Sequence, residues 1–315
     1  MTDDHTPAEL SWSWSGDDRL PAVRYSVEPI GWDAGSDIDP HNVHASAVLL
    51  GSTLPYTPSL DLHWYRHFLQ CLTLCQKKSL QNGASDGLPP STCKPPSQTF
   101  IAFDLEHNGD MVVKYYFLPS LKAASLGTGR LELTEAALSG LRLREPSDSA
   151  SVLDSFHLLT EYIATFPSGT VTVEIVAVDC VTPSKSRVKI YVRSRQTTFG
   201  SVLDMLTLGG RAAPLPESAV SSLKELWVNL FATAGNEAEI LEAPLPENPH
   251  CTAGILYYFE LKPGLPLPTS KVYLPVRHYA QDDEQIALGL SRYLEKRGKG
   301  LAGGMTYLDG VRKLW

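Results

Sequence analysis

Two kinds of hydrophobic pattern follow one another along the chain. Apolar and polar residues alternate on both sides of a polar or Gly/Pro-rich turn, which predicts pairs of antiparallel strands. These hairpins are expected over residues 9–30, 100–119, 171–194 and 254–279. Between and after them, apolar residues recur at helical spacing. The helical segments are 59–80, 150–166, 218–233 and 282–297.

The pattern therefore repeats a unit of two strands followed by helices. The four units cover approximately residues 9–99, 100–170, 171–253 and 254–315, and we expect them to form a single domain over residues 1–315. Hairpins of this kind can curl into a sheet with helices on one face and an interior on the other. The expected fold class is α+β, an antiparallel β-barrel surrounded by helices. The Pro-, Ser- and Gly-rich stretch 77–98 is expected to be a surface loop.

A cation and a tyrosine recur in the second strand of the hairpins. The pairs are Arg24-Tyr25, Lys114-x-Tyr116, Lys189-x-Tyr191 and Lys271-x-Tyr273. Because residues two apart in a strand face the same side, lysine and tyrosine share a face in the last three pairs. One such pair is typical of a solvated lysine beside a half-buried tyrosine. Three pairs at corresponding places in a repeat indicate a site inside the barrel.

Composition and charge limit the classes of partner and compartment that the chain is suited to. The formal net charge of -8 and a pI near 5.6 argue against nucleic acid or an anionic membrane surface, since both attract basic proteins. The sequence contains no run of 18 apolar residues and its first residues lack an apolar core, so we expect no membrane span or secretion signal. Five cysteines without a C-x-x-C pair favour free thiols in a reducing, cytoplasmic compartment.

Several strand motifs resemble one known family. They are P-A-E-L-S-W-S-W, V-R-Y-S-V-E-P-I-G, V-K-Y-Y-F-L-P, R-V-K-I-Y-V-R-S with a following T-L-G-G, and K-V-Y-L-P-V-R-H-Y. In this order, over about residues 7 to 300, they resemble the fungal indole prenyltransferases of the dimethylallyl tryptophan synthase-like family. The resemblance implies the ABBA fold, a ten-stranded antiparallel barrel with the active site in its lumen.

The resemblance also implies a reaction. A dimethylallyl group would pass from its diphosphate to an electron-rich aromatic ring, commonly the indole of tryptophan or of a tryptophan-derived cyclic dipeptide or alkaloid, in secondary metabolism. The residue types agree with this chemistry. Lysine and arginine neutralise a diphosphate leaving group. Tyrosine rings stabilise an allylic cation and keep water away from it.

The family pattern assigns roles to individual positions. It places the diphosphate on Arg24, Lys114, Arg187, Lys189 and Lys271. It places a tyrosine shield at Tyr116, Tyr191 and Tyr273, and Glu9 as the acceptor of the indole N–H hydrogen bond. The expected partners are dimethylallyl diphosphate and an aromatic acceptor. A homodimer remains open.

Other polar residues receive simpler interpretations. Asp104, Glu174 and Glu260 are expected to balance charges in the lumen or at its rim, and His278 to be a polar residue at a strand end. The run Asp282-Asp283-Glu284-Gln285 lacks the third acid of the magnesium-binding D-D-x-x-D motif. We therefore expect the diphosphate to be held by cations, with no metal or other cofactor required.

The sequence departs from the family in three places. Members that prenylate indole C4 carry a lysine as base just before an A-x-D-L motif, and Phe100 or Ile101 stands there in this chain. The family has a helical segment before P-x-E-x-S, where this sequence has six residues, and a fifth hairpin after the fourth; we expect both to be missing from this chain. We therefore expect about eight of the ten strands, with edges near Glu9 and Arg277. Two alternatives stay open: a truncated, inactive family member, or a barrel that only binds small molecules.

Overall fold

The computed structural model describes residues 6–13, 22–74, 97–106, 109–141, 146–231, 236–300 and 304–313, with side chains from residue 151 onward in the fifth of these ranges. The chain divides into two compact units, each described by itself. Unit 1 comprises Met1–Glu161, Thr172–Val192 and Tyr258–Thr269, and unit 2 comprises Tyr162–Val171, Arg193–Tyr257 and Ser270–Trp315. The single domain expected over residues 1–315 stays a prediction.

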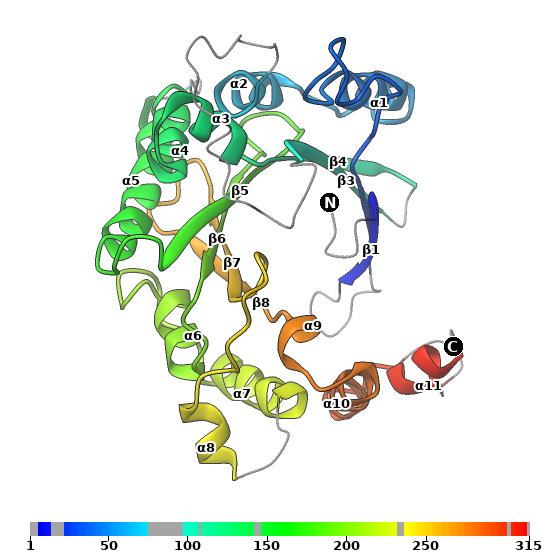
Figure 1. The fold of residues 1–315 in the computed structure, drawn as a ribbon, viewed down its shortest axis with the longest axis vertical. Helices are drawn as coiled ribbons and strands as arrows, with labels where there is room; N and C mark the ends of the chain where they lie inside the picture. The colour runs from blue at the N-terminus through cyan, green and yellow to red at the C-terminus, as the bar shows by residue number, and fades with distance from the viewer. Residues whose placement is uncertain are drawn as a thin grey trace. The chain divides into compact units, whose positions relative to one another are not determined.

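Eight strands form one sheet, and their order in the sheet is their order in the chain (Figure 1). They are β1 (Ala8–Ser13), β2 (Ala22–Val27), β3 (Thr99–Leu105), β4 (Met111–Phe117), β5 (Val171–Asp179), β6 (Val188–Ser194), β7 (Ile255–Leu261) and β8 (Thr269–Tyr273). Neighbouring strands from β1 to β5 pair antiparallel. The expected α+β fold with eight strands of an incomplete barrel is therefore confirmed.

The fourth hairpin ends earlier than the sequence pattern predicts. Strand β8 stops at Tyr273, and helix α9 (Val276–Tyr279) follows at once. Pro275 stands between them and has no backbone N–H to donate to a strand ladder, which explains the change. The predicted strand end near Arg277 is thus wrong, because Arg277 lies in a helix.

Helices of unit 1 lie along one side of strands β3 to β5 (Figure 1). They are α1 (His44–Thr53), η1 (Leu54–Tyr56), α2 (His63–Leu72), α3 (Ser120–Leu126), α4 (Arg130–Ser139) and α5 (Pro146–Ile163), which runs two residues past the unit boundary. Helix α2 buries Trp64, Tyr65, Phe68 and Leu72, whose spacing places them on one side of the helix.

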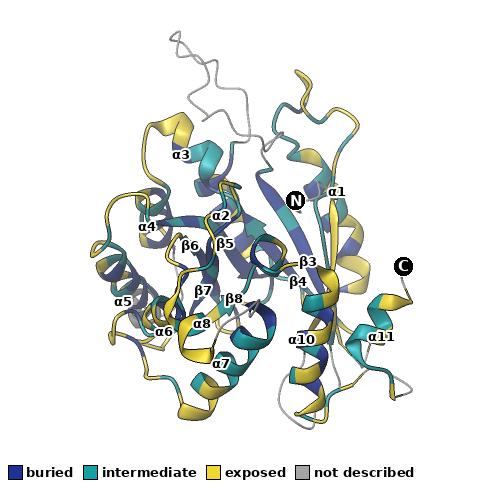
Figure 2. Ribbon diagram, turned by 60° about the horizontal axis from the view of Figure 1, so that its bottom comes forward, coloured by how far each residue is buried: buried dark blue, intermediate teal, exposed yellow. Residues whose placement is uncertain are grey.

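These helices cover what we call the outer face of the sheet. Phe117 of β4 has its ring centre 6.0 Å from that of Phe68, and Tyr115 lies edge-on to Tyr65 at 4.5 Å. Phe103 of β3 is 1 % exposed. Strands β3 to β6 are accordingly mostly dark blue in Figure 2. This interdigitated apolar layer is the core of unit 1.

The first hairpin differs from the second on this face. Leu10 is 80 % exposed and Trp12 is 52 % exposed, although both lie on strand β1. Their register partners on β2 are Tyr25 and Val23. The outer face of the β1–β2 hairpin therefore meets solvent where the β3–β4 hairpin meets helices.

Unit 2 contains a second group of helices. They are α6 (Phe199–Leu206), α7 (Glu217–Phe231), α8 (Glu237–Glu242), α9, α10 (Asp283–Glu295) and α11 (Tyr307–Arg312). Helices α7 and α10 approach so closely that a Cβ on Gly289 would meet the carbonyl oxygen of Asn229 at 2.2 Å. The side chain of Asp282 accepts a hydrogen bond from the backbone N–H of Gln285, so this acid caps α10.

Some sequence expectations concern features outside the sheet. The predicted loop 77–98 falls outside the described residues as far as residue 96. Cys71 and Cys180 are free thiols, and Cys180 is buried. Cys251 is disulfide-bonded, so the expectation of a free thiol is wrong at that position. Over the described ranges, none of the helices has the length and apolar character needed to cross a membrane.

Candidate functional site

Strand register decides which side chains share the face opposite the helices, which we call the inner face. Directly paired residues of an antiparallel sheet point to the same side. Arg24 pairs with Asp104, and Lys114 pairs with Ala102 on one side and Asp179 on the other. Glu9 pairs with Ser26, two residues from Arg24. Four neighbouring strands of unit 1 thus bring their charged residues to one face, and Glu9 of β1 shares that face.

Charged side chains form a continuous band on the inner face, which we call the charged tier. Its members are Arg24, Asp104, Lys114, Asp179, Arg187, Lys189, Glu260 and Lys262. At one end, the carboxylate of Asp104 pairs with Arg24, at 3.0 Å from Nε, and with the Lys114 amine. All eight residues belong to unit 1.

The other end of the charged tier is built around Asp179. One carboxylate oxygen accepts from the Lys189 amine at 3.0 Å, and the other accepts from Arg187 Nε at 2.7 Å. A second nitrogen of Arg187 donates to Glu260 at 2.6 Å. Lys262 pairs with the remaining oxygen of Glu260 at 3.1 Å. The guanidinium of Arg187 is therefore clamped between two carboxylates.

Aromatic rings form a second band two residues along the strands, which we call the aromatic tier. Its members are Phe100, Tyr116, Tyr191 and Tyr258. Phe100 and Tyr116 stack with ring centres 4.3 Å apart, and Tyr116 lies 6.0 Å from Tyr191. Strand β5 passes between these tyrosines, and it presents only Ala177 opposite Tyr116. The ring centre of Tyr191 lies 5.3 Å from that of Tyr258.

Burial sets the electrostatics of the charged tier. Lys189 is 4 % exposed, and burial lowers its pKa to about 8, against the opposing effect of Asp179. Burial also lowers the pKa of Lys114. Burial alone raises the pKa of Asp179, but the charges of Lys189 and Arg187 outweigh it and hold that pKa below its ordinary value. The tier thus contains two lysines that lose their protons more easily than lysines in water.

The structure brings together most of the predicted site residues. Arg24, Lys114, Arg187 and Lys189 lie in the charged tier, and Tyr116 and Tyr191 are neighbours in the aromatic tier. Glu9 lies on the inner face of β1, where it is exposed.

Two predicted residues belong to unit 2. Lys271 and Tyr273 lie on β8, both exposed, with the Lys271 amine 5.5 Å from the centre of the Tyr273 ring. This is a contact within one strand.

The predicted charge-balancing acids are found in ion pairs. Asp104 and Glu260 balance cations of the charged tier, as expected. Glu174 also pairs with a cation, but its partner is Arg130 of helix α4 at 2.8 Å, on the outer face. Charge balance is therefore found for Glu174 too, with a cation of a helix as its partner.

His278 has a different setting from the predicted strand end. It lies in helix α9, where its Nε2 is 2.7 Å from the hydroxyl of Thr252. Its ring centre lies 4.9 Å from that of His250. The predicted position at a strand end is wrong, because β8 ends before Pro275 and His278 lies in the helix that follows.

Sequence reasoning missed several residues of the two tiers. Tyr258 lies on β7 and Lys262 directly follows the last residue of that strand. Their spacing of two from Glu260 could have placed both on the inner face. Phe100 was noted only as the residue in place of a lysine. Asp179 was missed because a lone acid at the end of V-A-V-D has no distinguishing pattern.

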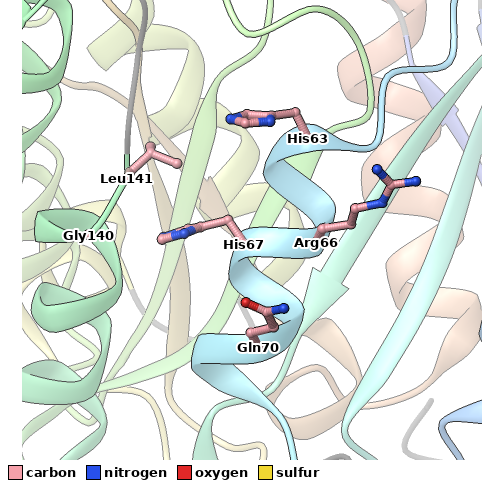
Figure 3. A pocket seen from close by; sticks show the side chains of 6 residues that line it. All are labelled: His63, Arg66, His67, Gln70, Gly140 and Leu141. Carbon is pink, nitrogen blue, oxygen red and sulfur yellow. The ribbon is translucent and has the colours of Figure 1, made fainter.

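A surface pocket lies elsewhere in unit 1, between helices α2 and α4 (Figure 3). Its lining residues are His63, Arg66, His67, Gln70, Gly140 and Leu141. The Nε2 of His67 lies 2.8 Å from the carbonyl oxygen of Ala137. The pocket contains no residue of either tier. Within the described ranges, no group of three or more His, Cys, Asp or Glu side chains is arranged to hold a metal ion.

Comparison with known proteins gives consistent matches. The family described as tryptophan dimethylallyltransferase matches residues 1–309. A 4-O-dimethylallyl-L-tyrosine synthase of Claviceps purpurea is 51% identical over 315 residues, which are 100% of this chain and 68% of that protein. A 7-dimethylallyltryptophan synthase of Aspergillus fumigatus is 32% identical over 302 residues, 95% of this chain and 61% of that protein.

Solved structures agree on the fold. The NotF prenyltransferase superposes with a TM-score of 0.75 at 24% identity, over 94% of this chain and 69% of that one. NotF has also been solved in complex with brevianamide F and DMSPP. The likeness shows that the sheet of this chain has the expected ABBA fold. The chain spans about two thirds of the length of these relatives.

Proposed function

The chain belongs to the tryptophan dimethylallyltransferase family, and from this premise we propose that it transfers a dimethylallyl group from dimethylallyl diphosphate to an aromatic small molecule. One observation carries the proposal: a charged tier and an aromatic tier lie next to each other on one face of unit 1. A prenyl diphosphate has the same two parts, an anionic head and an apolar, cation-forming tail. The proposed setting is secondary metabolism.

The charged tier is proposed to bind and release the diphosphate. When the allylic C–O bond breaks, its electron pair leaves with the diphosphate, whose charge increases. Arg187 and Lys189 are held at fixed positions by Asp179, so their charges need not reorganise during this step. Arg24 and Lys114 supply further positive charge. In this proposal protein cations, rather than a metal, hold the diphosphate.

The aromatic tier is proposed to surround the dimethylallyl cation. Ring faces attract cations through their quadrupole. Unlike an amine, a ring face is a weak nucleophile. The rings of Tyr116, Tyr191 and Tyr258 are close enough to form one continuous surface. Such a surface also excludes water, which would otherwise trap the cation as an alcohol. Tyr273 of β8 is also proposed to belong to the tyrosine shield, and the family resemblance alone supports this assignment.

The hydroxyl group of tyrosine is the acceptor we favour. The support is the 51% identity with a protein named for tyrosine O-prenylation, against 32% with one named for tryptophan. Phe100 lies on the inner face, stacked on Tyr116, and Phe100 or Ile101 stands where family members that prenylate indole C4 carry a lysine base. A phenol attacking through oxygen forms the new C–O bond and gives up an acidic O–H proton, which the released diphosphate can accept. No base for a ring C–H is needed.

An indole acceptor is the second candidate. It was the expectation from sequence, and the relative named as a 7-dimethylallyltryptophan synthase supports it. Glu9 is proposed to accept a hydrogen bond from the acceptor, either the indole N–H or the phenol O–H. Its inner-face position on β1 is compatible with both.

The test is incubation of the purified protein with dimethylallyl diphosphate, EDTA and one acceptor at a time. Tyrosine, tryptophan and a tryptophan-containing cyclic dipeptide are compared by mass spectrometry. We expect O-dimethylallyltyrosine as the main product. A prenylated indole as main product would replace the tyrosine proposal with the second candidate. Absence of product and of released diphosphate with every acceptor would favour an inactive member or a binding barrel.

A further inference from the structure

The charged tier contains an apparent contradiction. A site for a diphosphate gains from positive charge, yet three carboxylates lie among its five cations. All three are buried, with Asp104 at 8 % exposure and both Asp179 and Glu260 at 7 %. Burying a carboxylate is costly unless it is paired. Their retention beside the proposed diphosphate site calls for a role.

Each of the three carboxylates pairs with two cations, and Asp179 differs from the other two in which cations and strands it joins. Its two oxygens accept from two different cations, Lys189 at 3.0 Å and Arg187 at 2.7 Å. It is also the register partner of Lys114 on the neighbouring strand. Three strands, β4, β5 and β6, thus converge on this carboxylate. Glu260, in contrast, holds Arg187 and the less buried Lys262.

Lys189 depends on this carboxylate for its charge. The charged groups that face it are Asp179 of β5, Lys114 of β4 and Arg187 beside it on its own hairpin. Two of these three are cations and oppose a further positive charge. Beyond them lie Asp104 on β3, Arg24 on β2 and Glu260 on β7. Asp104 pairs with Lys114 and with Arg24, and Glu260 pairs with Arg187. Asp179 is therefore the one carboxylate, within the described residues, that hydrogen-bonds the Lys189 amine.

We propose that Asp179 is a positioning residue for the diphosphate: it aims Arg187 and Lys189 as a pair and keeps Lys189 protonated. This inference rests on the proposed function and deepens it. The proposal predicts the opposite effect on anion binding from the one expected by counting charges. Removal of a negative charge from an anion site should tighten anion binding, but removal of this one weakens binding, because a cation is lost with it.

The experiment measures the affinity of inorganic pyrophosphate by calorimetry between about pH 6.5 and about pH 8.5. Asp179→Asn is compared with the wild type and with Glu260→Gln, which removes the same charge from the same tier but leaves Lys189 its partner. Asp179→Glu is the conservative variant. The ionisation of pyrophosphate is common to all four proteins, so differences between them belong to the protein. Thermal unfolding checks that each is folded.

We expect Asp179→Asn to weaken pyrophosphate binding by at least about tenfold at about pH 8, the pH where Lys189 titrates, and less at about pH 6.5. Glu260→Gln should leave the midpoint of the pH dependence unchanged, and Asp179→Glu should restore most of the affinity. Tighter binding by Asp179→Asn at every pH would overturn the proposal. So would an equal weakening by both neutral variants with the same pH dependence.

A second variant keeps the proposal testable if Asp179→Asn does not fold. Lys189→Arg replaces the titrating amine by a guanidinium that stays charged at these pH values. It should remove the loss of affinity that the wild type shows as pH rises through about 8, and persistence of that loss would contradict the proposal. Failure of the wild type to bind either pyrophosphate or dimethylallyl diphosphate would instead refute the proposed function.

Discussion

The outer and inner faces of strands β3 to β6 are both shielded from water, but their side chains differ in kind. On the outer face, Phe103 and Phe117 are 1 % and 0 % exposed; Phe103 stacks on Tyr25 of β2, and Phe117 packs against Phe68 of α2. On the inner face, Lys114 and Lys189 are 5 % and 4 % exposed and pair with carboxylates. Burial alone therefore does not separate core from site.

The two faces also differ in what they contribute energetically. Removing apolar surface from water stabilises the fold by about 25 cal/mol per Å². Buried ion pairs recover little more than their desolvation cost, about zero net in many cases. Outer-face substitutions should therefore reduce stability, and inner-face substitutions should reduce activity. The following predictions test that division, beginning with the largest effect.

Phe117→Ala is expected to lower the free energy of unfolding by about 3–5 kcal/mol, because it leaves a cavity beneath α2. Urea unfolding followed by circular dichroism measures the change. Leu126→Ala, at a 53 % exposed position, is the control and should change it by less than about 0.5 kcal/mol. Equal effects of the two substitutions would show that the outer face is not the core.

Lys189→Met is expected to reduce kcat/KM for dimethylallyl diphosphate by about 100-fold, about 2.7 kcal/mol, because the diphosphate loses a fixed cation. Asp179 keeps Arg187 as its partner, so unfolding should change by less than about 2 kcal/mol. Steady-state kinetics and urea unfolding are measured on the same preparation. A variant that is fully active but unstable would show that Lys189 stabilises the fold rather than the bound diphosphate.

Tyr191→Leu is expected to lower kcat by about tenfold, about 1.4 kcal/mol, because the aromatic tier loses its central ring face. KM for the diphosphate should stay nearly constant, and more dimethylallyl alcohol should form from trapping by water. Tyr191→Phe keeps the ring and should retain most of the rate. If the two variants behave alike, the phenol hydroxyl rather than the ring is what matters.

Rising pH should move the activity and the stability in opposite directions. The pKa of Lys189 is lowered to about 8 in the folded state, so the unfolded chain binds the extra proton above that pH. Between about pH 8 and about pH 9, Lys189 should add about 1 kcal/mol to the free energy of unfolding while diphosphate affinity falls. Lys189→Arg is the comparison for both measurements. A parallel decline of stability and affinity would contradict the assignment.

Leu10→Ser should have the smallest effect. Leu10 is 80 % exposed on the outer face of the first hairpin, where no described helix covers it. We expect the free energy of unfolding to change by less than about 0.5 kcal/mol. A loss comparable with that of Phe117→Ala would mean that this surface is covered in solution.

The sequence predicted much of this arrangement because a strand has a simple period. The spacing of Lys114 and Tyr116 placed both on one face, and the register confirms that face for Lys114 and its partner Asp179. Which strand lies beside which follows from the repeat. The pairing of Asp179 with Lys189 depends on how far β5 extends past β6, and the alternation pattern does not determine that.

Helices were predicted less completely than strands. The long amphipathic helices α7 and α10 were expected close to their observed bounds. Helices α1 and α4 were missed. Helix α1 buries only Ser46, Leu50 and Thr53, and its apolar residues do not form a single stripe. Such helices are stabilised by their place in the fold rather than by their own pattern.

Ala177 takes part in no interaction of either tier, and yet it determines how the aromatic tier is spaced. Strand β5 crosses between Tyr116 and Tyr191, and a methyl group at that crossing lets the rings approach to 6.0 Å. A valine or leucine there would divide the aromatic surface into two compartments. Substrate selectivity in such a barrel can therefore change through a side chain that carries no functional group. Comparisons restricted to charged and aromatic positions would overlook that route of divergence.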